Sequence, residues 1–264
     1  MKIVAILLLA ILTFSCSDDD EKGTEENKGQ WAMIFNESVK NDSNPVDKTE
    51  KFMFDGERLI QHIIKQRYFE EEISNEVNLS YSDNQVTVTT DYLTLVYTLN
   101  SEGYASQCVY SLSSQNRIYQ FSYSAEGYLT GIVENIDDTE YSSTSLTYEN
   151  GDITSISSKM NGLENKFIYE PGEESSTYHL PCLGLLEIHP LTFHIEALYA
   201  GLLGKDPRHF TIRSCPAGSN DEKTVYSYGF DKKGNPSRMI CQTTYAGGQA
   251  SYYPYTRNIS VSFE

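Results

Sequence analysis

The sequence lacks the motifs by which many enzymes and cofactor-binding proteins are recognised. It contains no G-x-S-x-G nucleophile elbow, no G-x-G-x-x-G turn and no P-loop. Only one tryptophan, Trp31, stands against 20 tyrosines, and no pair of its five cysteines has zinc-finger spacing. The apolar run at residues 3–12 is too short for a membrane-spanning helix, which needs about 20 residues. Whether the protein is an enzyme stays uncertain, and a non-enzymatic role is favoured.

Positive charge is scarce. The chain has 20 Lys and Arg residues against 37 Asp and Glu residues, a formal net charge of −17. Such a protein repels phosphate backbones, so nucleic acid is excluded as a partner. With so many acids, some carboxylate pairs lie at glycosidase distance by chance, and a glycoside hydrolase is therefore only an outside alternative.

The first residues predict export and lipidation. Lys2, the apolar run and the pair Ser15-Cys16 have the layout of a lipoprotein signal peptide over residues 1–15. Thr13 stands where the usual lipobox has leucine, and this looser form resembles the lipoboxes of Bacteroides proteins. We expect Cys16 to carry the lipid. An ordinary cleaved signal peptide is the alternative.

Residues 16–30 are predicted to be a disordered acidic tether that follows the lipidated cysteine. The segment has no apolar periodicity and cannot bury enough surface to fold. Its start resembles the acidic signal that sends Bacteroides-type lipoproteins to the outer face of the outer membrane. The expected location is a lipid-anchored, surface-exposed protein of the outer membrane, with a periplasm-facing anchor as the alternative. The export-signal residues are Ser17, Asp18, Asp19, Asp20 and Glu21.

A short phrase recurs along the rest of the chain and predicts repeated β-hairpins. Each copy reads apolar, polar, aromatic, then polar residues around Gly or Asn, then a new alternating run, as in F-S-Y-S-A-E-G-Y-L-T-G-I. The pairs Asp55-Gly56 and Asn150-Gly151 suit hairpin turns with positive φ, and the alternation marks half-buried strands. The third residues of the copies are Phe54, Tyr81, Tyr97, Tyr123, Tyr148, Tyr169 and Tyr228.

Hairpins in series predict a mainly β protein with one antiparallel meander domain over residues 31–264. One hairpin cannot bury its apolar face alone, so about ten to fourteen strands should form a common sheet. A sheet of that length should curve into a barrel-like or half-barrel shell, because closure removes its edges. Ser and Thr are too frequent on one face for the strands to span a membrane.

A helical insertion is predicted at residues 179–210, where the hairpin pattern stops. Pro190 can open a short helix near 190–203, and Gly204 can cap its C-terminus. We expect this helix to act as a plug or lid on the concave face of the sheet. Its apolar stripe would consist of Leu191, Ile195, Leu198 and Leu202.

Four histidines lie in the insertion, but their spacing does not predict a metal site. His189 and His194 are five residues apart with a proline between them, whereas ligands on one helix face need i, i+4 spacing. We therefore predict no metal and no cofactor, and we assign the histidines to packing or to the surface. The other two are His179 and His209.

The cysteines leave two interpretations open. Export to an oxidising compartment permits disulfides, and Cys182 and Cys215 flank the unusual segment, so they are the favoured pair. Buried free thiols are the alternative, and would also account for Cys108 and Cys241.

The repeated phrase resembles two known patterns. Its aromatic-x-Tyr core followed by glycine is similar to the YD repeat of Rhs-type proteins, although only Asp55 and Asp231 place aspartate near a turn. Tether and repeats together resemble Bacteroides-type outer-membrane lipoproteins of unknown function, described as having a porin-like β fold. The likeness covers residues 52 to 264. It implies a fold without an established activity, so it assigns no functional residues.

The predicted location and the tyrosines suggest a binding role. Tyr252, Tyr253 and Tyr255 cluster around Pro254 and could stack on sugar rings, although most tyrosines of a sheet fill cross-strand pairs. Our leading hypothesis is an accessory binding lipoprotein for a glycan or another nutrient, working beside an outer-membrane transporter. The alternatives are a carrier of a lipid or other apolar ligand inside the β shell, and a structural or assembly component of the envelope.

Overall fold

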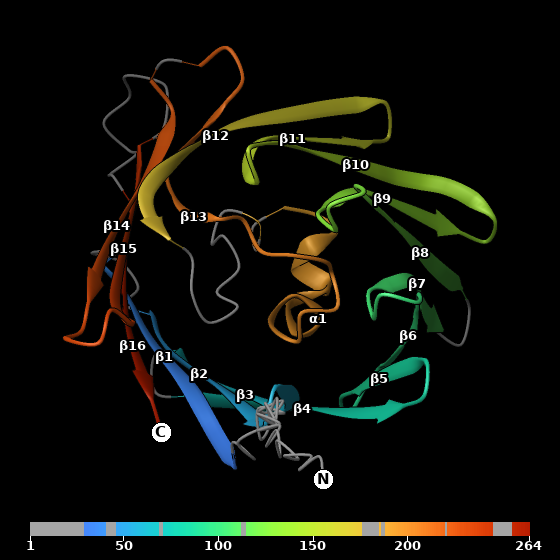
Figure 1. The fold of residues 1–264 in the computed structure, drawn as a ribbon, viewed down its shortest axis with the longest axis horizontal. Helices are drawn as coiled ribbons and strands as arrows, with labels where there is room; N and C mark the ends of the chain where they lie inside the picture. Colours follow the sequence, from blue (N-terminus) through green and yellow to red (C-terminus); the bar gives the residue numbers. More distant parts are fainter. Residues whose placement is uncertain are drawn as a thin grey trace, which may run out of the picture.

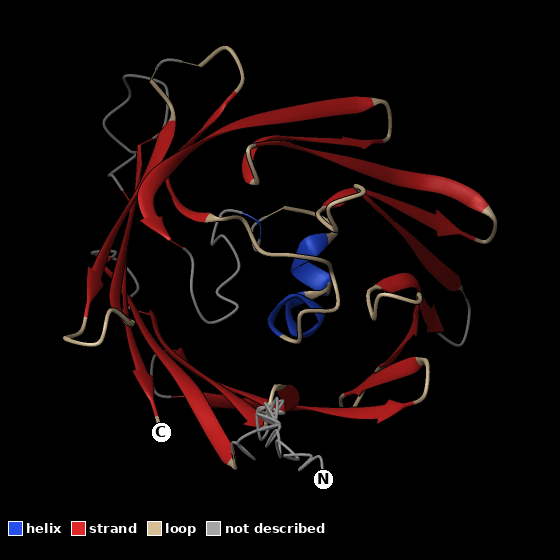
Figure 2. Ribbon diagram, in the orientation of Figure 1, coloured by secondary structure: helices blue, strands red, loops and turns tan. Residues whose placement is uncertain are grey.

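The protein folds into a closed antiparallel β-barrel around a short helical segment (Figure 1, Figure 2). The computed structural model describes residues 29–40, 46–68, 71–111, 115–175, 185, 188–219, 221–244 and 255–264. Sixteen strands follow one another around the barrel in chain order, and β16 pairs with β1 to close it. The predicted mainly β meander with one helical insertion is confirmed, and the shell is a full barrel. The expected strand number, about ten to fourteen, was too low.

The strands of the first half are β1 (Gln30–Lys40), β2 (Val46–Asp55), β3 (Arg58–Tyr68), β4 (Glu71–Ser82), β5 (Gln85–Thr89), β6 (Thr94–Leu99), β7 (Ala105–Ser111) and β8 (Asn116–Tyr123). Those of the second half are β9 (Leu129–Ile136), β10 (Thr139–Glu149), β11 (Asp152–Met160), β12 (Leu163–Ser175), β13 (His209–Pro216), β14 (Lys223–Phe230), β15 (Pro236–Thr244) and β16 (Tyr255–Phe263). Between β12 and β13 lie the 3-10 helix η2 (Leu191–Phe193) and the α-helix α1 (Ile195–Tyr199).

Turn chemistry explains where the strands reverse. Asn150 and Gly151 both have positive φ, 54° and 88°, as a type I′ hairpin between β10 and β11 requires. At the turn between β2 and β3, Gly56 has a φ of 60°, whereas Asp55 is still part of β2. The hairpin predicted at Asp55-Gly56 therefore forms, but its positive φ begins one residue later than expected.

Alternation along each strand gives the barrel an apolar lumen. On β5, Val86 and Val88 are buried in the core, while Gln85, Thr87 and Thr89 face outward. Burial of such aliphatic side chains contributes about 1.5–3 kcal/mol each. The period-two pattern read in the sequence thus sorts side chains between lumen and exterior.

The outward-facing residues of β10 are polar, as they are on β5. Leu146 points into the core, whereas Ser145, Thr147 and Glu149 are exposed. A membrane-spanning barrel needs an outward apolar band about 25 Å tall, and β5 and β10 do not carry one. The apolar face of these strands is therefore the opposite of the one that a membrane porin presents to lipid. In the described part of the chain, no helix has the length and apolar character needed to cross a membrane.

Residues 188–206, which we call the plug, run through the lumen and pack against the wall (Figure 1). Leu191, Leu198 and Leu202 of the predicted stripe are buried, and Ile195 is half-buried. The backbone of Leu202 accepts a hydrogen bond from the Ala105 amide at 2.7 Å. The predicted plug is thus present and is anchored on β7.

The helical part of the plug is shorter than predicted. Pro190 precedes η2, and the backbone at His194 leaves helical geometry, with φ −118° and ψ 28°, before α1 begins. The buried His194 ring is held by wall residues, and this tertiary contact interrupts the helix that local sequence favours. Ala200 ends α1, so Gly204, with φ 88°, serves a later turn instead of capping the helix.

Candidate functional site

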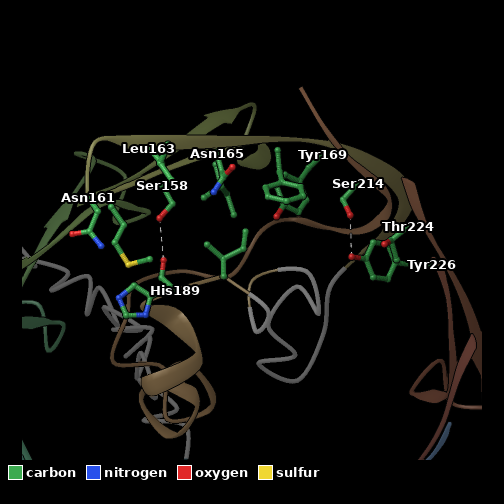
Figure 3. Close-up of a pocket in the computed structure, with 13 residues that line it drawn as sticks. Ser158, Asn161, Leu163, Asn165, Tyr169, His189, Ser214, Thr224 and Tyr226 are labelled. Atoms are coloured by element: carbon green, nitrogen blue, oxygen red, sulfur yellow. Dashed lines mark hydrogen bonds between the residues drawn. The ribbon is translucent and has the colours of Figure 1, made fainter. Parts of the chain in front are cut away.

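A pocket of about 360 Å³ lies between the plug and the wall formed by β11 to β14 (Figure 3). Its volume is within the range of about 300–1,000 Å³ that is usual for small-molecule sites. Two neighbouring strands supply most of the lining because alternate residues of β11 and β12 point into the lumen. The apolar lining residues are Ile156, Met160, Leu163, Phe167, Tyr169, Ile188 and Tyr226.

Large apolar side chains remain open to solvent at the β11–β12 hairpin. Leu163 is 74% exposed and Met160 is 39% exposed, and both line the pocket. Exposed apolar side chains that gather at a cavity mark binding sites more often than singly scattered ones. This part of the pocket can therefore gain free energy by covering its apolar surface with a ligand.

The polar lining of the pocket is uncharged apart from a histidine. Asn161 and Asn165 lie on the same hairpin as Leu163, as Figure 3 shows, and Ser214 and Thr224 lie on the neighbouring strands β13 and β14. Among the described lining residues there is no Asp, Glu, Lys or Arg, although the chain as a whole is strongly acidic. The pocket therefore differs in chemistry from the protein surface.

The histidine at the pocket is held by a buried carboxylate. Glu134 of β9 is fully buried, and its Oε2 lies 2.7 Å from Nε2 of His189. Glu134 also accepts hydrogen bonds from Arg117 at 3.0 Å, Tyr119 at 3.2 Å and Ser142 at 2.8 Å. Burial raises the pKa of Glu134, but the hydrogen bonds from His189 and Ser142 outweigh burial and hold that pKa below its usual value. The carboxylate is thus ionised at neutral pH.

The backbone of His189 is fixed as well as its ring. Its carbonyl oxygen accepts hydrogen bonds from Thr144 Oγ1 at 3.2 Å and from Ser158 Oγ at 3.3 Å. The ring retains 30% exposure and lines the pocket. His189 is therefore a polar group of fixed position at the edge of an apolar cavity.

His194 is a packing residue inside the plug. Tyr97 places its hydroxyl 2.8 Å from Nδ1, and the ring of Tyr119 stands perpendicular to the His194 ring at 4.5 Å between centroids. Burial lowers the pKa of His194 to about 3, so the ring is neutral. The remaining described histidine of the insertion, His209, lies at the start of β13 and pairs with Asp152 of β11 at 2.8 Å.

A second buried cluster joins the plug to the wall. His62 of β3 is fully buried, with Nδ1 2.8 Å from Glu196 of α1 and Nε2 3.4 Å from Glu50 of β2. Sequence analysis missed His62, Glu50 and Glu134. For Glu134, the local signal was its inward place beside Ile132 in the apolar alternation of β9.

Most site residues predicted from the sequence lie outside the described residues. This holds for Cys16, the acidic stretch 17–21, His179, Cys182 and the pair Tyr252-Tyr253. Tyr255 begins β16, and its side chain is not among those described. The predicted stacking and export residues therefore stay predictions.

The structure bears on only part of the predictions about cysteines and metals. Cys215 lies half-buried on β13, and no disulfide joins the described cysteines Cys108, Cys215 and Cys241. Because Cys182 is not described, its pairing with Cys215 stays a prediction. Within the described ranges, no cluster of three or more His, Cys, Asp or Glu side chains is arranged to hold a metal ion.

Comparison with known proteins identifies the fold family. Residues 52–238, well over half of the chain, match the model of DUF4595, a domain of unknown function with porin-like fold. The chain belongs to this family. The resemblance expected from the hairpin phrase is thereby confirmed for the porin-like fold, whereas the lipid anchor and the kinship with YD repeats are not established by it.

Solved structures of porin-like proteins share the fold of this family member. One, from Bacteroides uniformis, superposes with a TM-score of 0.79 at 26% identity, covering 88% of this chain and 96% of that one. Another, from Bacteroides vulgatus, has a TM-score of 0.52 at 12% identity, covering 86% and 96% of the two chains, and shows the fold alone. No curated protein matched the chain.

Proposed function

We propose that this porin-like barrel binds a small, largely apolar ligand in the pocket between the plug and the β11–β14 wall. The observation that carries the proposal is the open apolar lining of a cavity of about 360 Å³, with Leu163 left 74% exposed. A ligand there would cover apolar surface that the protein itself leaves in contact with water. The protein would act as a carrier or accessory binding protein and not as an enzyme.

Glycan binding is the second candidate, and a specific feature supports it. Tyr169 and Tyr226 line the pocket together with Asn161 and Asn165, and rings beside amides can serve a sugar. The apolar side chains of the β11–β12 hairpin favour the apolar ligand, because a sugar would leave them without matching surface. Calorimetry against a panel of glycans tests this candidate. If the pocket binds a glycan and does not bind apolar compounds, glycan binding becomes the favoured function.

The proposed setting is the outer membrane, where a lipid on Cys16 would hold the barrel beside the bilayer. The polar outer faces of β5 and β10 support a barrel that hangs from a tether and does not sit in the hydrocarbon. Surface exposure would depend on the acidic stretch 17–21. Replacing Asp18, Asp19 and Asp20 together by alanine should reduce shaving by protease on intact cells, and unchanged shaving would refute the export signal.

Binding can be tested with N-phenylnaphthylamine, an uncharged probe whose fluorescence rises in apolar sites. We expect saturable binding. We expect Leu163→Gln to weaken this binding by about 1 kcal/mol, since the ligand would cover the Leu163 side chain and part of that apolar contact is lost. Ile73→Gln is the matched control, because Ile73 is 52% exposed on β4 and does not line the pocket. Equal effects of the two substitutions, or no saturable binding, would refute the proposal.

A further inference from the structure

Glu134 determines which nitrogen of His189 carries the proton. The Glu134 carboxylate is ionised and can only accept hydrogen bonds, and it lies 2.7 Å from Nε2 of His189. Nε2 must therefore bear the hydrogen that is donated to Glu134. A neutral imidazole with its hydrogen on Nε2 has a lone pair on Nδ1.

The acceptor that remains on His189 is Nδ1, and the ring that carries it lines the pocket. Among the residues that the structure describes, none hydrogen-bonds to Nδ1 of His189, and the 30% exposed ring lines the cavity. A ligand that covers this ring without offering a hydrogen would strip water from Nδ1 and leave it unpaired. Leaving a polar group unpaired on burial costs about 1–3 kcal/mol, so a ligand with a donor has an advantage.

We propose that the pocket selects apolar ligands that carry one hydrogen-bond donor, such as a hydroxyl or a ring N–H, and that His189 is the specificity-determining residue that accepts this hydrogen. The inference rests on the proposed function and gives it a ligand class, a neutral amphiphile. Glu134 is the positioning residue, because it touches no ligand and acts only by holding the imidazole ring and its tautomer.

Anionic ligands are disfavoured because the described lining of the pocket lacks cationic side chains and because a negative carboxylate lies behind it. No Lys or Arg is found among the described lining residues, and the negative Glu134 carboxylate lies directly behind the His189 ring. Arg117, 3.0 Å from Glu134, offsets that charge from the side away from the ligand. A carboxylate placed against Nδ1 would meet a lone pair without a cation, so fatty-acid-like ligands should bind less well than the corresponding alcohols.

Three ligands with one apolar body test the selection on the unaltered protein. α-Naphthol offers a donor, its methyl ether keeps the oxygen but has no donor, and α-naphthoate carries a negative charge. In calorimetry at pH 8 we expect α-naphthol to bind about three- to ten-fold more tightly than the ether, the effect of one net hydrogen bond, and more tightly than the naphthoate.

Substitutions at His189 then assign the selection to this residue. His189→Gln keeps an amide donor for Glu134 and a carbonyl acceptor for the ligand, so the preference for naphthol over its ether should be retained. His189→Phe removes the acceptor, so the two affinities should become equal. The readout is the ratio of the affinities for α-naphthol and its ether. A general loosening of the fold would weaken both affinities and would not bring this ratio to one.

The outcomes separate the two proposals. Equal affinity of α-naphthol and its ether for the unaltered protein would overturn the role of His189 while leaving the apolar pocket in place. A ratio that persists in His189→Phe would overturn it as well. Failure of all three compounds and of N-phenylnaphthylamine to bind would overturn the proposed function itself. If His189→Phe does not fold, the ligand series on the unaltered protein still decides the matter.

Discussion

We predict that His62→Phe loosens the attachment of the plug in a pH-dependent way. His62 lies fully buried between Glu196 of α1 and Glu50 of β2, and its ring stacks on Phe52 with 4.0 Å between centroids. Phenylalanine preserves the stacking and removes the charge. The substitution therefore isolates the electrostatic part of the contact between plug and wall.

The direction of the pH effect follows from the pKa shifts. Burial lowers the pKa of His62, but the hydrogen bond to Glu196 and the nearby Glu50 carboxylate outweigh burial and raise it above the ordinary value of 6.5. A group whose folded pKa is raised stabilises the fold fully below its unfolded pKa and loses that contribution as pH rises through the folded pKa. For Glu50, burial raises the pKa, but His62 and Lys48 lower it by more, so the pKa is below its ordinary value of 4.5. The contribution of Glu50 to stability is therefore lost only in acid, as the pH falls below 4.5.

The expected magnitude comes from the burial of the partners. Without His62, the Glu196 and Glu50 side chains, 13% and 17% exposed, lose their shared cation. Breaking a fully buried pair costs about 3–5 kcal/mol. Lys48, 2.9 Å from Glu50, and the residual exposure reduce this to roughly 2–3 kcal/mol. For a domain of this size that corresponds to a fall in Tm of roughly 5–10 °C.

Thermal unfolding of the unaltered protein and of His62→Phe at pH 6 and pH 9 checks the reasoning. The difference in Tm between the two proteins should be large at pH 6 and should shrink as the pH rises through the raised pKa of native His62. Lys51→Met is the control, because Lys51 is 34% exposed, its partner Glu264 is 61% exposed, and an exposed pair of that kind contributes only about 0–1 kcal/mol. A difference in Tm that grows as the pH rises would refute a charged His62.

Three further outcomes are expected. Leu191→Ala should lower the free energy of unfolding in urea by about 2–5 kcal/mol, because Leu191 is fully buried in the plug and its removal leaves a cavity. Gly204→Ala should lower the Tm, since Gly204 has a φ of 88° and an added Cβ would lie 2.6 Å from the Gly127 carbonyl oxygen; the same change at Gly218, with φ 81° and open space around it, measures the effect of φ alone. Cys16→Ala should move the protein from the membrane fraction to the soluble fraction on cell fractionation, and unchanged membrane association would contradict the predicted lipid anchor.

The fold was predictable because its determinants are local. Asn150-Gly151 specifies a hairpin within a few residues, and the alternation that flanks it specifies which face is buried. The strand number was underestimated because β1 and β16, the strands that close the barrel, do not carry the repeated phrase. Closure brings together segments more than 200 residues apart, such as Glu37 and Arg257, and turn chemistry contains no information about such pairs.

The site was not predictable because its partners are distant in the sequence. Glu134 and His189 are 55 residues apart, and His62 and Glu196 are 134 residues apart. Each alone resembles a polar residue on a surface strand or helix. A polar residue in an inward phase, as Glu134 is within L-T-G-I-V-E-N-I, was the only sequence signal, and it does not name the partner.

Barrel size explains why the chain contains a plug and where a pocket remains. A barrel of sixteen strands has a lumen wider than its inward side chains can fill, and in membrane porins water occupies the difference. Here most of the buried inward side chains are apolar, so a water-filled lumen would be unfavourable, and the plug with Leu191 and Leu198 supplies apolar volume. The described plug packs mainly on the other part of the wall, and the face of β11 to β14 keeps an apolar surface beyond it. The argument that accounts for the plug thus also supports the proposal of an apolar ligand at this face.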